Sequence, residues 1–376
     1  MAVPKLRFEE FKNEWKTINL KQILSFKNGI NANKDSYGRG IKYISVGDIL
    51  NNTFITYDKI KGLVDINEKV LKENSVEYGD IIFQRSSETF NDIGHSNVYL
   101  DKEKVATFGG FVIRGKKIGN YNPLFLNYLL KSPYNRRKII IKGAGAQHYN
   151  ISQEELEKIN INFTNENEQK KIANLFSLLD KKIELQKQKI EALKIYKKGL
   201  IKELFSFNTF YEKNLEDLCH ITTGKLDANA MTINGKYRFY TCAKEYYHIN
   251  TYAFDTEALL ISGNGAYVGY IHYYKGKFNA YQRTYVLDNF NENIFYIKYY
   301  LDTFLPQRIL TERKEGNTPY IVLSTLAKMP IIFPSIEIQN QIITTLSKFD
   351  IKLTLENKKL ANLNIMKKSL LQQMFI

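Results

Sequence analysis

The sequence predicts an α+β protein made of two similar domains, each followed by one long helix. Three observations predict this fold class. Residues 167–205 align without a gap to residues 337–375. Apolar residues in both copies recur at alternating steps of four and three, the period of a coiled coil. The segments before each copy consist of short β-branched and aromatic runs between Asn, Gly and Lys loops, which is typical of small sheets. An internal repeat fixes the architecture before local structure is assigned, so the chain is read as a duplicated unit.

The first domain, taken as residues 1–165, shares a faint frame with the second domain, taken as residues 207–335. The matched segments are Asn19–Ile23 before Gly29 with Asn214–Leu218 before Gly224, Ile41–Ile44 with Tyr237–Tyr240, Asp80–Phe83 with Ala258–Ile261, Ile93-Gly94 with Val268-Gly269, and Ala106-Thr-Phe before Phe111–Ile113 with Ala280-Tyr-Gln before Tyr285–Leu287. Helical segments at 124–130 and 294–305 close each domain, and residues 56–74 have no counterpart. The loops at 84–88 and 262–266 differ, which favours two modules with different ligands, although drift after duplication would leave a similar trace.

Each repeat copy predicts one long helix, over residues 166–206 and 336–376, of roughly 55 Å at about 1.5 Å per residue. Its apolar seam runs through Ile172, Phe176, Leu179, Ile183, Ile190, Leu193, Leu200 and Leu204 in the first copy, and Ile342, Leu346, Phe349, Leu353, Leu360, Leu363, Leu370 and Met374 in the second. Polar residues interrupt both seams at the same places, Gln186/Glu356 and Lys197/Lys367. Such residues can fix the register of a coiled coil. We therefore expect the two helices to pack on each other; the alternative is that each lies on a globular core.

Composition narrows the class of protein. A chain of 376 residues with 44% hydrophobic content can form two or three domains with real cores. A net charge of +15 favours a polyanionic partner, although Lys-, Asn- and Ile-rich usage also follows genome base composition. Cys219 and Cys242 are the two cysteines, and we expect neither a secretory leader nor a membrane-spanning segment. We expect a cytoplasmic protein with reduced thiols and no membrane partner.

The sequence offers no catalytic site. It lacks an Asn-Pro-Pro-Tyr or Asp-Pro-Pro-Tyr motif for adenine methylation and a Gly-rich phosphate loop ending in Gly-Lys-Ser/Thr. The nearest string, Asn122–Phe125, reads as a helix cap. A zinc site from Cys219, His220, Cys242 and His248 is not expected, because paired Cys-x-x-Cys spacing is missing. No catalytic residue, cofactor or metal is therefore predicted.

With two similar domains, each followed by a long helix, the chain resembles the specificity (S) subunit of type I restriction–modification systems. The resemblance lies in the opening Pro4–Phe8 and Trp15, and in the junction Ile151-Ser152, Leu156, Ile159–Ile161, Glu168-Gln169, Ile172, which recurs as Leu323-Ser324, Leu326, Met329, Ile331, Pro334, Gln339, Ile342. The chain departs from the family pattern at Ile338, where Glu is usual, and at Thr164, where Pro is usual.

The resemblance implies two target recognition domains, residues 1–165 and 207–335, joined by spacer helices that pack antiparallel. Each recognition domain would read one half of a bipartite double-stranded DNA target. The helices would set the spacing of the half-sites and dock two methyltransferase (M) subunits, with motor-nuclease (R) subunits completing a complex in which this chain has no activity of its own. Half-sites on one face of B-DNA lie about 34 Å apart, a span that a rigid helix of roughly 55 Å can bridge.

DNA-reading residues are sought among polar and basic side chains in loops, because Arg reads guanine, Asn and Gln read adenine, and Lys mostly holds phosphate. The candidates are Lys34, Tyr37, Arg39, Arg85, Ser86, Ser87, Asn91, His95, Lys142, Gln147 and His148 in the first domain, and Lys225, Asn229, Lys244, Tyr246, Asn264, Tyr267, Gln282, Arg283, Arg313 and Lys314 in the second. Arg85, Gln147, Gln282 and Arg283 are favoured because small neighbours permit close backbone approach. The alternative function is a coiled-coil structural adaptor that binds proteins rather than DNA.

Overall fold

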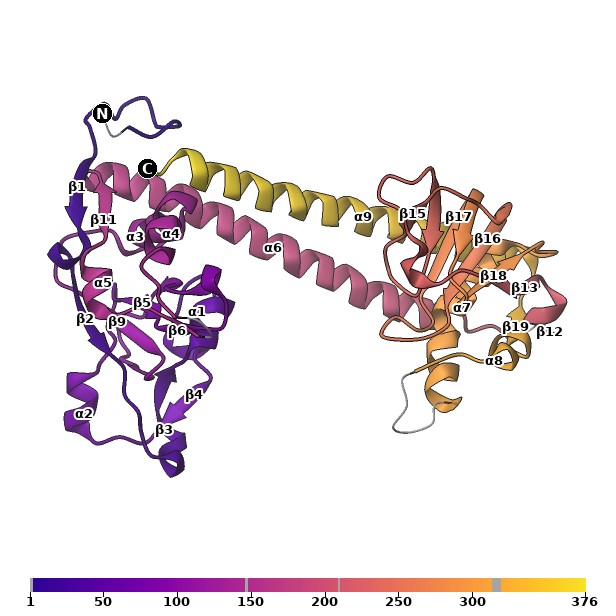
Figure 1. Ribbon diagram of the computed structural model, residues 1–376. Helices are drawn as coiled ribbons and strands as arrows, with labels where there is room; N and C mark the ends of the chain where they lie inside the picture. Colours follow the sequence, from indigo (N-terminus) through magenta and orange to yellow (C-terminus); the bar gives the residue numbers. More distant parts are fainter. Residues whose placement is uncertain (1–2, 146–147, 209, 313–318) are drawn as a thin grey trace. The chain divides into compact units, whose positions relative to one another are not determined.

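A computed structural model describes residues 3–145, 148–208, 210–312 and 319–376 (Figure 1). The chain folds into two compact units. Unit 1 comprises residues 1–189 and 357–376, and unit 2 comprises residues 190–356. The two long helices predicted from the repeat are α6 (Glu166–Leu204) and α9 (Ile336–Gln373). Each unit therefore contains a globular α+β part, the first half of one long helix and the second half of the other.

The globular part of unit 1 is built around a four-stranded antiparallel sheet in the order β2-β9-β5-β7. Its strands are β1 (Lys16–Asn19), β2 (Leu24–Asn28), β3 (Tyr37–Ile44), β4 (Gly62–Val64), β5 (Ile81–Gln84), β6 (Ser86–Ser87), β7 (Ser96–Val98), β8 (Thr107–Phe108), β9 (Val112–Lys117), β10 (Tyr149–Asn150) and β11 (Asn160–Phe163). Its shorter helices are α1 (Val46–Asn51), α2 (Glu68–Glu73), α3 (Pro123–Lys131), α4 (Pro133–Ile140) and α5 (Gln153–Glu157). A second sheet, β4-β3-β8, and the pairs β1-β11 and β6-β10 complete this part.

The globular part of unit 2 has one six-stranded sheet in the order β13-β18-β16-β17-β14-β15. Its strands are β12 (Tyr211–Asn214), β13 (His220–Thr223), β14 (Tyr237–Tyr240), β15 (Tyr247–Ile249), β16 (Phe254–Ser262), β17 (Ile271–Ala280), β18 (Thr284–Asp288) and β19 (Pro330–Phe333), and its shorter helices are α7 (Ile294–Glu312) and α8 (Leu323–Ala327). All pairings are antiparallel except β14 with β17. The predicted small sheets with closing helices are thus confirmed in both units, and most of their strand pairings are antiparallel, with β3-β8 and β14-β17 parallel.

Within each unit, segments of α6 and α9 run antiparallel. In unit 1, Phe176 stacks on Phe375 at a centroid distance of 5.7 Å, while Leu179 and Ile183 lie in one buried cluster with Leu363. In unit 2, Ile342 and Leu346 are buried in the core, with Ile201 and Leu204 packed against it. All sixteen predicted seam residues are buried or half-buried. The four-three period therefore identified the contact face of both helices.

Polar residues on the seam form the same ion pair in both units. Lys367 donates to Asp180 in unit 1. Tyr128 of α3 also donates to Asp180, at 2.8 Å, and burial together with this carboxylate raises the pKa of the phenol. The pairing ties the two helix segments to each other and to the sheet domain.

In unit 2, Lys197 donates to Asp350, and Tyr299 of α7 donates to the same carboxylate at 3.0 Å. These residues occupy the repeat positions of the residues in unit 1. A one-turn slip of either helix segment would separate the charges, so the arrangement specifies register. None of the described helices is long and apolar enough to cross a membrane.

Candidate nucleic-acid interface

In unit 1, the interior strand β5 ends in a polar loop beside a hollow of about 350 Å³. Arg85, the first residue after β5, is fixed by its main chain: its N–H donates to the carbonyl of Phe111 at 2.8 Å, and its carbonyl accepts from Ile151 N–H at 3.0 Å. The hollow is lined by Asn28, Arg85, Lys142, Ala144, Asn150, Ile151, Ser152, Gln153, Glu154 and Glu155. We refer to this place as edge 1.

In unit 2, the interior strand β16 ends beside a smaller hollow of about 140 Å³. Gly263 is the first residue after β16. Its N–H donates to the carbonyl of Arg283 at 2.8 Å, and its carbonyl accepts from Ile321 N–H at 2.7 Å. The hollow is lined by Thr223, Gly263, Asn264, Gln282, Arg283, Tyr285, Tyr320 and Ile321. We refer to this place as edge 2.

The matching hydrogen bonds make the two edges equivalent. Gly29 N–H donates to the carbonyl of Val112 at 3.0 Å, as Gly224 N–H donates to that of Thr284 at 3.3 Å. A Cβ on Gly29 would lie 2.0 Å from a main-chain oxygen, and one on Gly224 would lie 1.9 Å from another, so both positions require glycine. The shared frame predicted from Gly29 and Gly224 is therefore present at the site itself.

One predicted correspondence is wrong by two residues. The sequence comparison set Phe111 against Tyr285, but the sheet registers set Ile113 opposite Phe83 and Tyr285 opposite Ile261, the ends of matched strands. Phe111 therefore corresponds to Arg283. A slip of two residues preserves which side chains face each side of a sheet, so the hydrophobic pattern could not detect it.

Edge 1 combines cations, amides and carboxylates. The half-buried Arg85 guanidinium donates to the carbonyl of Gly110 at 3.3 Å, and Ser86 Oγ donates to Asn150 Oδ1 at 2.5 Å. Lys142 Nζ lies 3.1 Å from Glu155, whose pKa is lowered by its hydrogen bonds to Lys158 and Lys142. The lysines offset the negative charge of Glu155 at the rim and leave Arg85 as the cation beside the strand end.

At edge 2, Gln282 and Arg283 are exposed on the turn before β18. Gln282 N–H donates to the carbonyl of Leu226 at 2.9 Å, and its side-chain Nε2 donates to Asp227 Oδ1 at 2.9 Å. Cys242 Sγ contacts the carbonyl of Arg283 at 3.2 Å. These contacts fix the turn and leave the guanidinium of Arg283 at the surface, where it can donate two parallel hydrogen bonds.

Of the other predicted residues of unit 1, His148 contacts Asn150 of edge 1, whereas Lys34, Arg39, Ser87 and Asn91 make their contacts elsewhere in the unit. Lys34 and Arg39 are exposed before and on β3, with Arg39 paired to Asp65 at 3.2 Å. The main-chain oxygen of Asn91 accepts from Arg136 at 2.9 Å. Ser87 is buried and accepts from Thr89 N–H, and the main-chain oxygen of the exposed His148 accepts from Asn150 at 3.4 Å.

In unit 2, Asn264 pairs with Tyr320 in an isolated bridge at edge 2. Lys225 is exposed next to Leu226, and Tyr246 lies 4.3 Å from the guanidinium of Arg238, centroid to Cζ. Gln147 and Arg313, both predicted to contact DNA, lie outside the described residues, as does Lys314.

The sequence search missed several edge residues, among them Phe111, Asn150 and Tyr320. The search was confined to polar and basic side chains in loops, which excluded Phe111 although two glycines precede it. No local signal marks Asn150 or Tyr320, because backbone pairing with the strand end places them.

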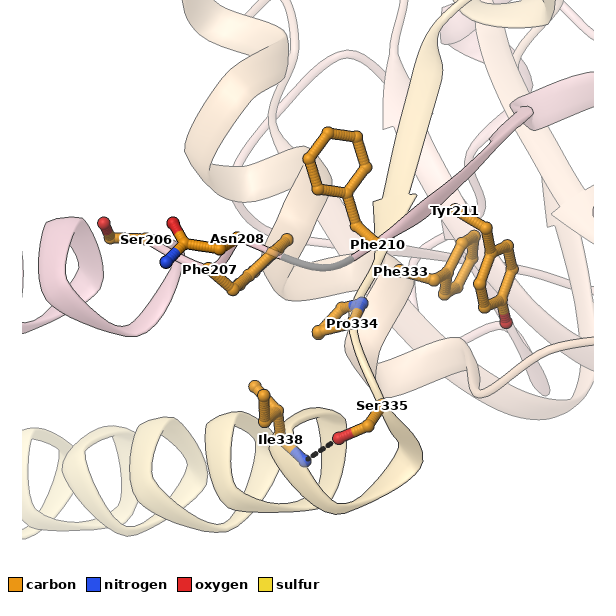
Figure 2. A pocket seen from close by; sticks show the side chains of 9 residues that line it. All are labelled: Ser206, Phe207, Asn208, Phe210, Tyr211, Phe333, Pro334, Ser335 and Ile338. Atoms are coloured by element: carbon orange, nitrogen blue, oxygen red, sulfur yellow. Dashed lines mark hydrogen bonds between the residues drawn. The ribbon is translucent and has the colours of Figure 1, made fainter.

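A third hollow, of about 620 Å³, lies in unit 2 where α6 ends and α9 begins (Figure 2). It is lined by Ser206, Phe207, Asn208, Phe210, Tyr211, Phe333, Pro334, Ser335 and Ile338, and Ser335 Oγ accepts from Ile338 N–H at 3.5 Å. The aromatic lining lacks the cations of the two edges. Within the described part of the chain, no group of three or more His, Cys, Asp or Glu residues could hold a metal ion.

Comparison with known proteins places both units in one family. The model of the type I restriction modification DNA specificity domain matches residues 12–194 and again residues 208–364. The chain is 41% identical over 122 residues to the type I restriction enzyme EcoDI specificity subunit of Escherichia coli, covering 32% of this chain and 27% of that protein. It is 30% identical over 219 residues to the type I restriction enzyme MjaX specificity subunit of Methanocaldococcus jannaschii, covering 56% and 50%. The matches thus span about a quarter and half of these two relatives.

Solved structures with the same fold cover nearly the whole chain. The S subunit of a type I restriction-modification system from M. genitalium superposes with a TM-score of 0.64 at 19% identity, over 100% of this chain and 99% of that one. A chain from a structural study of complex assembly and conformational transition of the type I R-M system superposes with a TM-score of 0.62 at 13% identity, over 95% and 96%. The repeated family match, together with the shared fold, assigns the chain: it belongs to the type I restriction modification DNA specificity domain family.

Proposed function

We propose that this chain is the sequence-specific DNA-binding specificity subunit of a type I restriction–modification complex. One observation carries the proposal: two equivalent edges, built on the same backbone hydrogen bonds, present different side chains at the same positions. Equal frames with unequal side chains suit a protein that reads two different half-sites. The net charge of +15 suits a polyanionic partner.

The division of labour follows from this proposal. Residues 1–165 and 207–335 are the two target recognition domains, and residues 166–206 and 336–376 are the spacer helices. The chain reads DNA, whereas methyl transfer, translocation and cleavage belong to the methyltransferase and motor-nuclease subunits.

The candidate DNA-reading residues at the edges are Arg85, Ser86, Asn264, Gln282 and Arg283. Arginine at the surface can donate two hydrogen bonds to guanine, and the amides suit adenine. Lys34, Arg39, Asn91, His148, Lys225 and Tyr246 are kept as candidates for contacts with phosphate or with neighbouring bases.

Selection from a randomised duplex library tests the function. The full chain, assembled with type I methyltransferase subunits, should enrich a bipartite sequence with a fixed gap, and its affinity should fall steeply with salt. Arg283→Ala should weaken discrimination at one half-site by about 1–3 kcal/mol and leave the other unchanged. Enrichment of no sequence, with protein partners retained, would favour the structural adaptor instead.

The spacer helices are proposed to set the gap between the half-sites. Removing four residues from each helix would shorten it by about 6 Å. In the same selection, the gap should change while both half-site sequences stay the same. New half-site bases would contradict this role.

The partners are proposed to number two methyltransferase chains for each copy of this chain. The repeat gives α6 and α9 equivalent surfaces, and equivalent surfaces bind two copies of one partner alike. Native mass spectrometry of the saturated complex should show two methyltransferase chains. Saturation at one would contradict the symmetry argument.

A further inference from the structure

Each edge carries one arginine and one exposed aromatic ring, but at different positions of the shared backbone frame. The residue after the interior strand is Arg85 at edge 1 and Gly263 at edge 2. The residue that accepts its N–H is Phe111 at edge 1 and Arg283 at edge 2. Each edge therefore has one arginine, but on opposite sides of the same hydrogen bond.

An exposed aromatic ring accompanies the arginine in each case. At edge 1 the ring is Phe111, which is 69% exposed. At edge 2 it is Tyr320, which is 51% exposed and lies directly before Ile321, as Asn150 lies before Ile151 at edge 1. At the position of Phe111 in edge 1, edge 2 has Arg283. At the position of Asn150, it has Tyr320.

The setting of Phe111 holds its main chain firmly but leaves its ring at the surface. It occupies the third position of the turn that Val112 N–H closes onto the carbonyl of Gly109 at 2.9 Å, and its own carbonyl accepts from Arg85. Among the described residues, its ring belongs to none of the buried clusters and pairs with no other ring. An exposed phenylalanine ring, on a main chain that is hydrogen-bonded to that of an arginine, is a ready apolar contact for a partner.

We propose that Phe111 is a specificity-determining residue of the first half-site, whose ring contacts the methyl group of a thymine next to the base read by Arg85. Apolar contact with this methyl group is how Phe distinguishes thymine in the major groove. Tyr320 takes the corresponding role in the second half-site, beside Arg283. Across the strand end the ring precedes the arginine at edge 1 and follows it at edge 2, so the two edges read differently ordered bases although their backbones match.

This inference rests on the proposed function, and its test separates the two. The test uses the full chain assembled with methyltransferase subunits, and the bipartite duplex that this assembly selects. In that duplex each thymine of the first half-site is replaced in turn by uracil, which lacks only the methyl group. At one position the replacement should weaken binding of the unaltered chain about three- to tenfold.

Phe111→Ala should lose a similar factor on the thymine duplex and show no further loss on the uracil duplex, because the contact is already absent. Phe111→Leu should keep part of the methyl discrimination, because it keeps an apolar side chain. Ile118→Ala is the matched control: Ile118 is 60% exposed at the other end of β9 and should behave like the unaltered chain. All three variants should melt at the temperature of the unaltered chain.

The inference is overturned if no uracil replacement in the first half-site matters, if Phe111→Ala still distinguishes thymine from uracil, or if Ile118→Ala loses the same factor. Each of these outcomes leaves bipartite DNA binding, and hence the proposed function, intact. Absence of a selected sequence for the unaltered chain would instead contradict the proposed function itself.

Discussion

Unit 1 and unit 2 hold their helix segments with the same side chains but begin their long helices differently. At the start of α6, Glu168 is fully buried and accepts from Arg7 Nε at 2.7 Å, from Trp15 Nε1 at 3.3 Å and from Thr164 Oγ1. At the same repeat position in α9, Ile338 is half-buried and lines the open aromatic hollow of Figure 2.

The difference follows from how the chain arrives at each helix. In unit 1 residues 3–14 lie against the helix ends, where Leu6 N–H donates to the carbonyl of Gln373 at 3.0 Å and Phe8 packs against the core. In unit 2, α6 ends at Leu204 and β12 begins at Tyr211, and Ser206, Phe207 and Phe210 between them line the hollow. The ion pairs that fix helix register are the same in both units, whereas the ends are free to differ because register does not depend on them.

The largest expected effect concerns the seam, where the two units differ in burial. Leu363 is 7% exposed in unit 1, whereas its repeat partner Leu193 is half-buried in unit 2. Leu363→Asp places a carboxylate in an apolar cluster. It should therefore reduce the free energy of unfolding of unit 1 by about 3–4 kcal/mol. Leu193→Asp should reduce that of unit 2 by about 1–2 kcal/mol. Native-state hydrogen exchange measures each unit separately.

The repeat supplies a control for the seam substitutions. Ile195 and Ile365 occupy matched repeat positions on the outer face of the helices and are 67% and 66% exposed. Aspartate at either should change stability by less than about 0.5 kcal/mol. If aspartate lowered stability equally at Leu363, at Leu193 and at these outer positions, the lost stability would come from helix propensity rather than from packing.

The next effect concerns the helix starts. Arg7→Met leaves the Glu168 carboxylate buried without its cation and should destabilise unit 1 by about 3 kcal/mol. Adding Glu168→Ile, which gives α6 the residue of α9, should recover more than half of that loss, since it removes the unpaired charge. Ile338→Glu should cost unit 2 less than about 1 kcal/mol, because the new carboxylate lies at an open hollow. Thermal unfolding of the variants gives the ranking, and a cost of Ile338→Glu equal to that of Arg7→Met would erase the contrast.

Sequence alone predicted the parts of the fold in which apolar residues recur at a regular spacing. The seam was found because Ile172, Phe176 and their successors recur at helical spacing, and the sheets because apolar runs are bounded by loop residues. Lys197 and Lys367 were recognised as seam interruptions, but their partners were not. Asp180 and Asp350 reach them only when the helices run antiparallel, a relation that no single helix records.

The candidate site was less accessible to sequence reasoning. Arg85 and Arg283 were favoured for their small neighbours, and both lie at the matched edges. The correspondence of Phe111 with Arg283 required the sheet register, since a two-residue slip is silent in a strand. Tyr320 reaches edge 2 through a bridge to Asn264, more than fifty residues away in sequence, and such contacts leave no local pattern.

The smallest expected effect concerns two opposite charges at matched places. In each unit a tyrosine donates to the aspartate of the ion pair. Lys131 follows Tyr128 by three residues in α3, and Asp302 follows Tyr299 by three residues in α7. Burial, reinforced by Lys367 and opposed by Asp180, lowers the pKa of Lys131 to about 7. Burial raises the pKa of Asp302, although Lys298 and Lys197 act against it. Both units therefore keep a charge with a shifted pKa beside the same ion pair, but of opposite sign.

The two charges should give the units opposite responses to pH. Between pH 7 and pH 9 the unfolded chain keeps the proton of Lys131 while folded unit 1 releases it, so the stability of unit 1 should rise with pH. Above pH 3.8, folded unit 2 retains a proton on Asp302 that the unfolded chain has lost, so this group makes stability fall as pH rises toward its raised pKa. Hydrogen exchange of Lys131→Met should show a flatter rise in unit 1, and that of Asp302→Asn a gain in unit 2 at pH 7. Each change should stay below about 1 kcal/mol, because both side chains keep access to water. Parallel pH responses in the two units, or slopes unchanged by the substitutions, would show that the ion pairs rather than these neighbours control the titration.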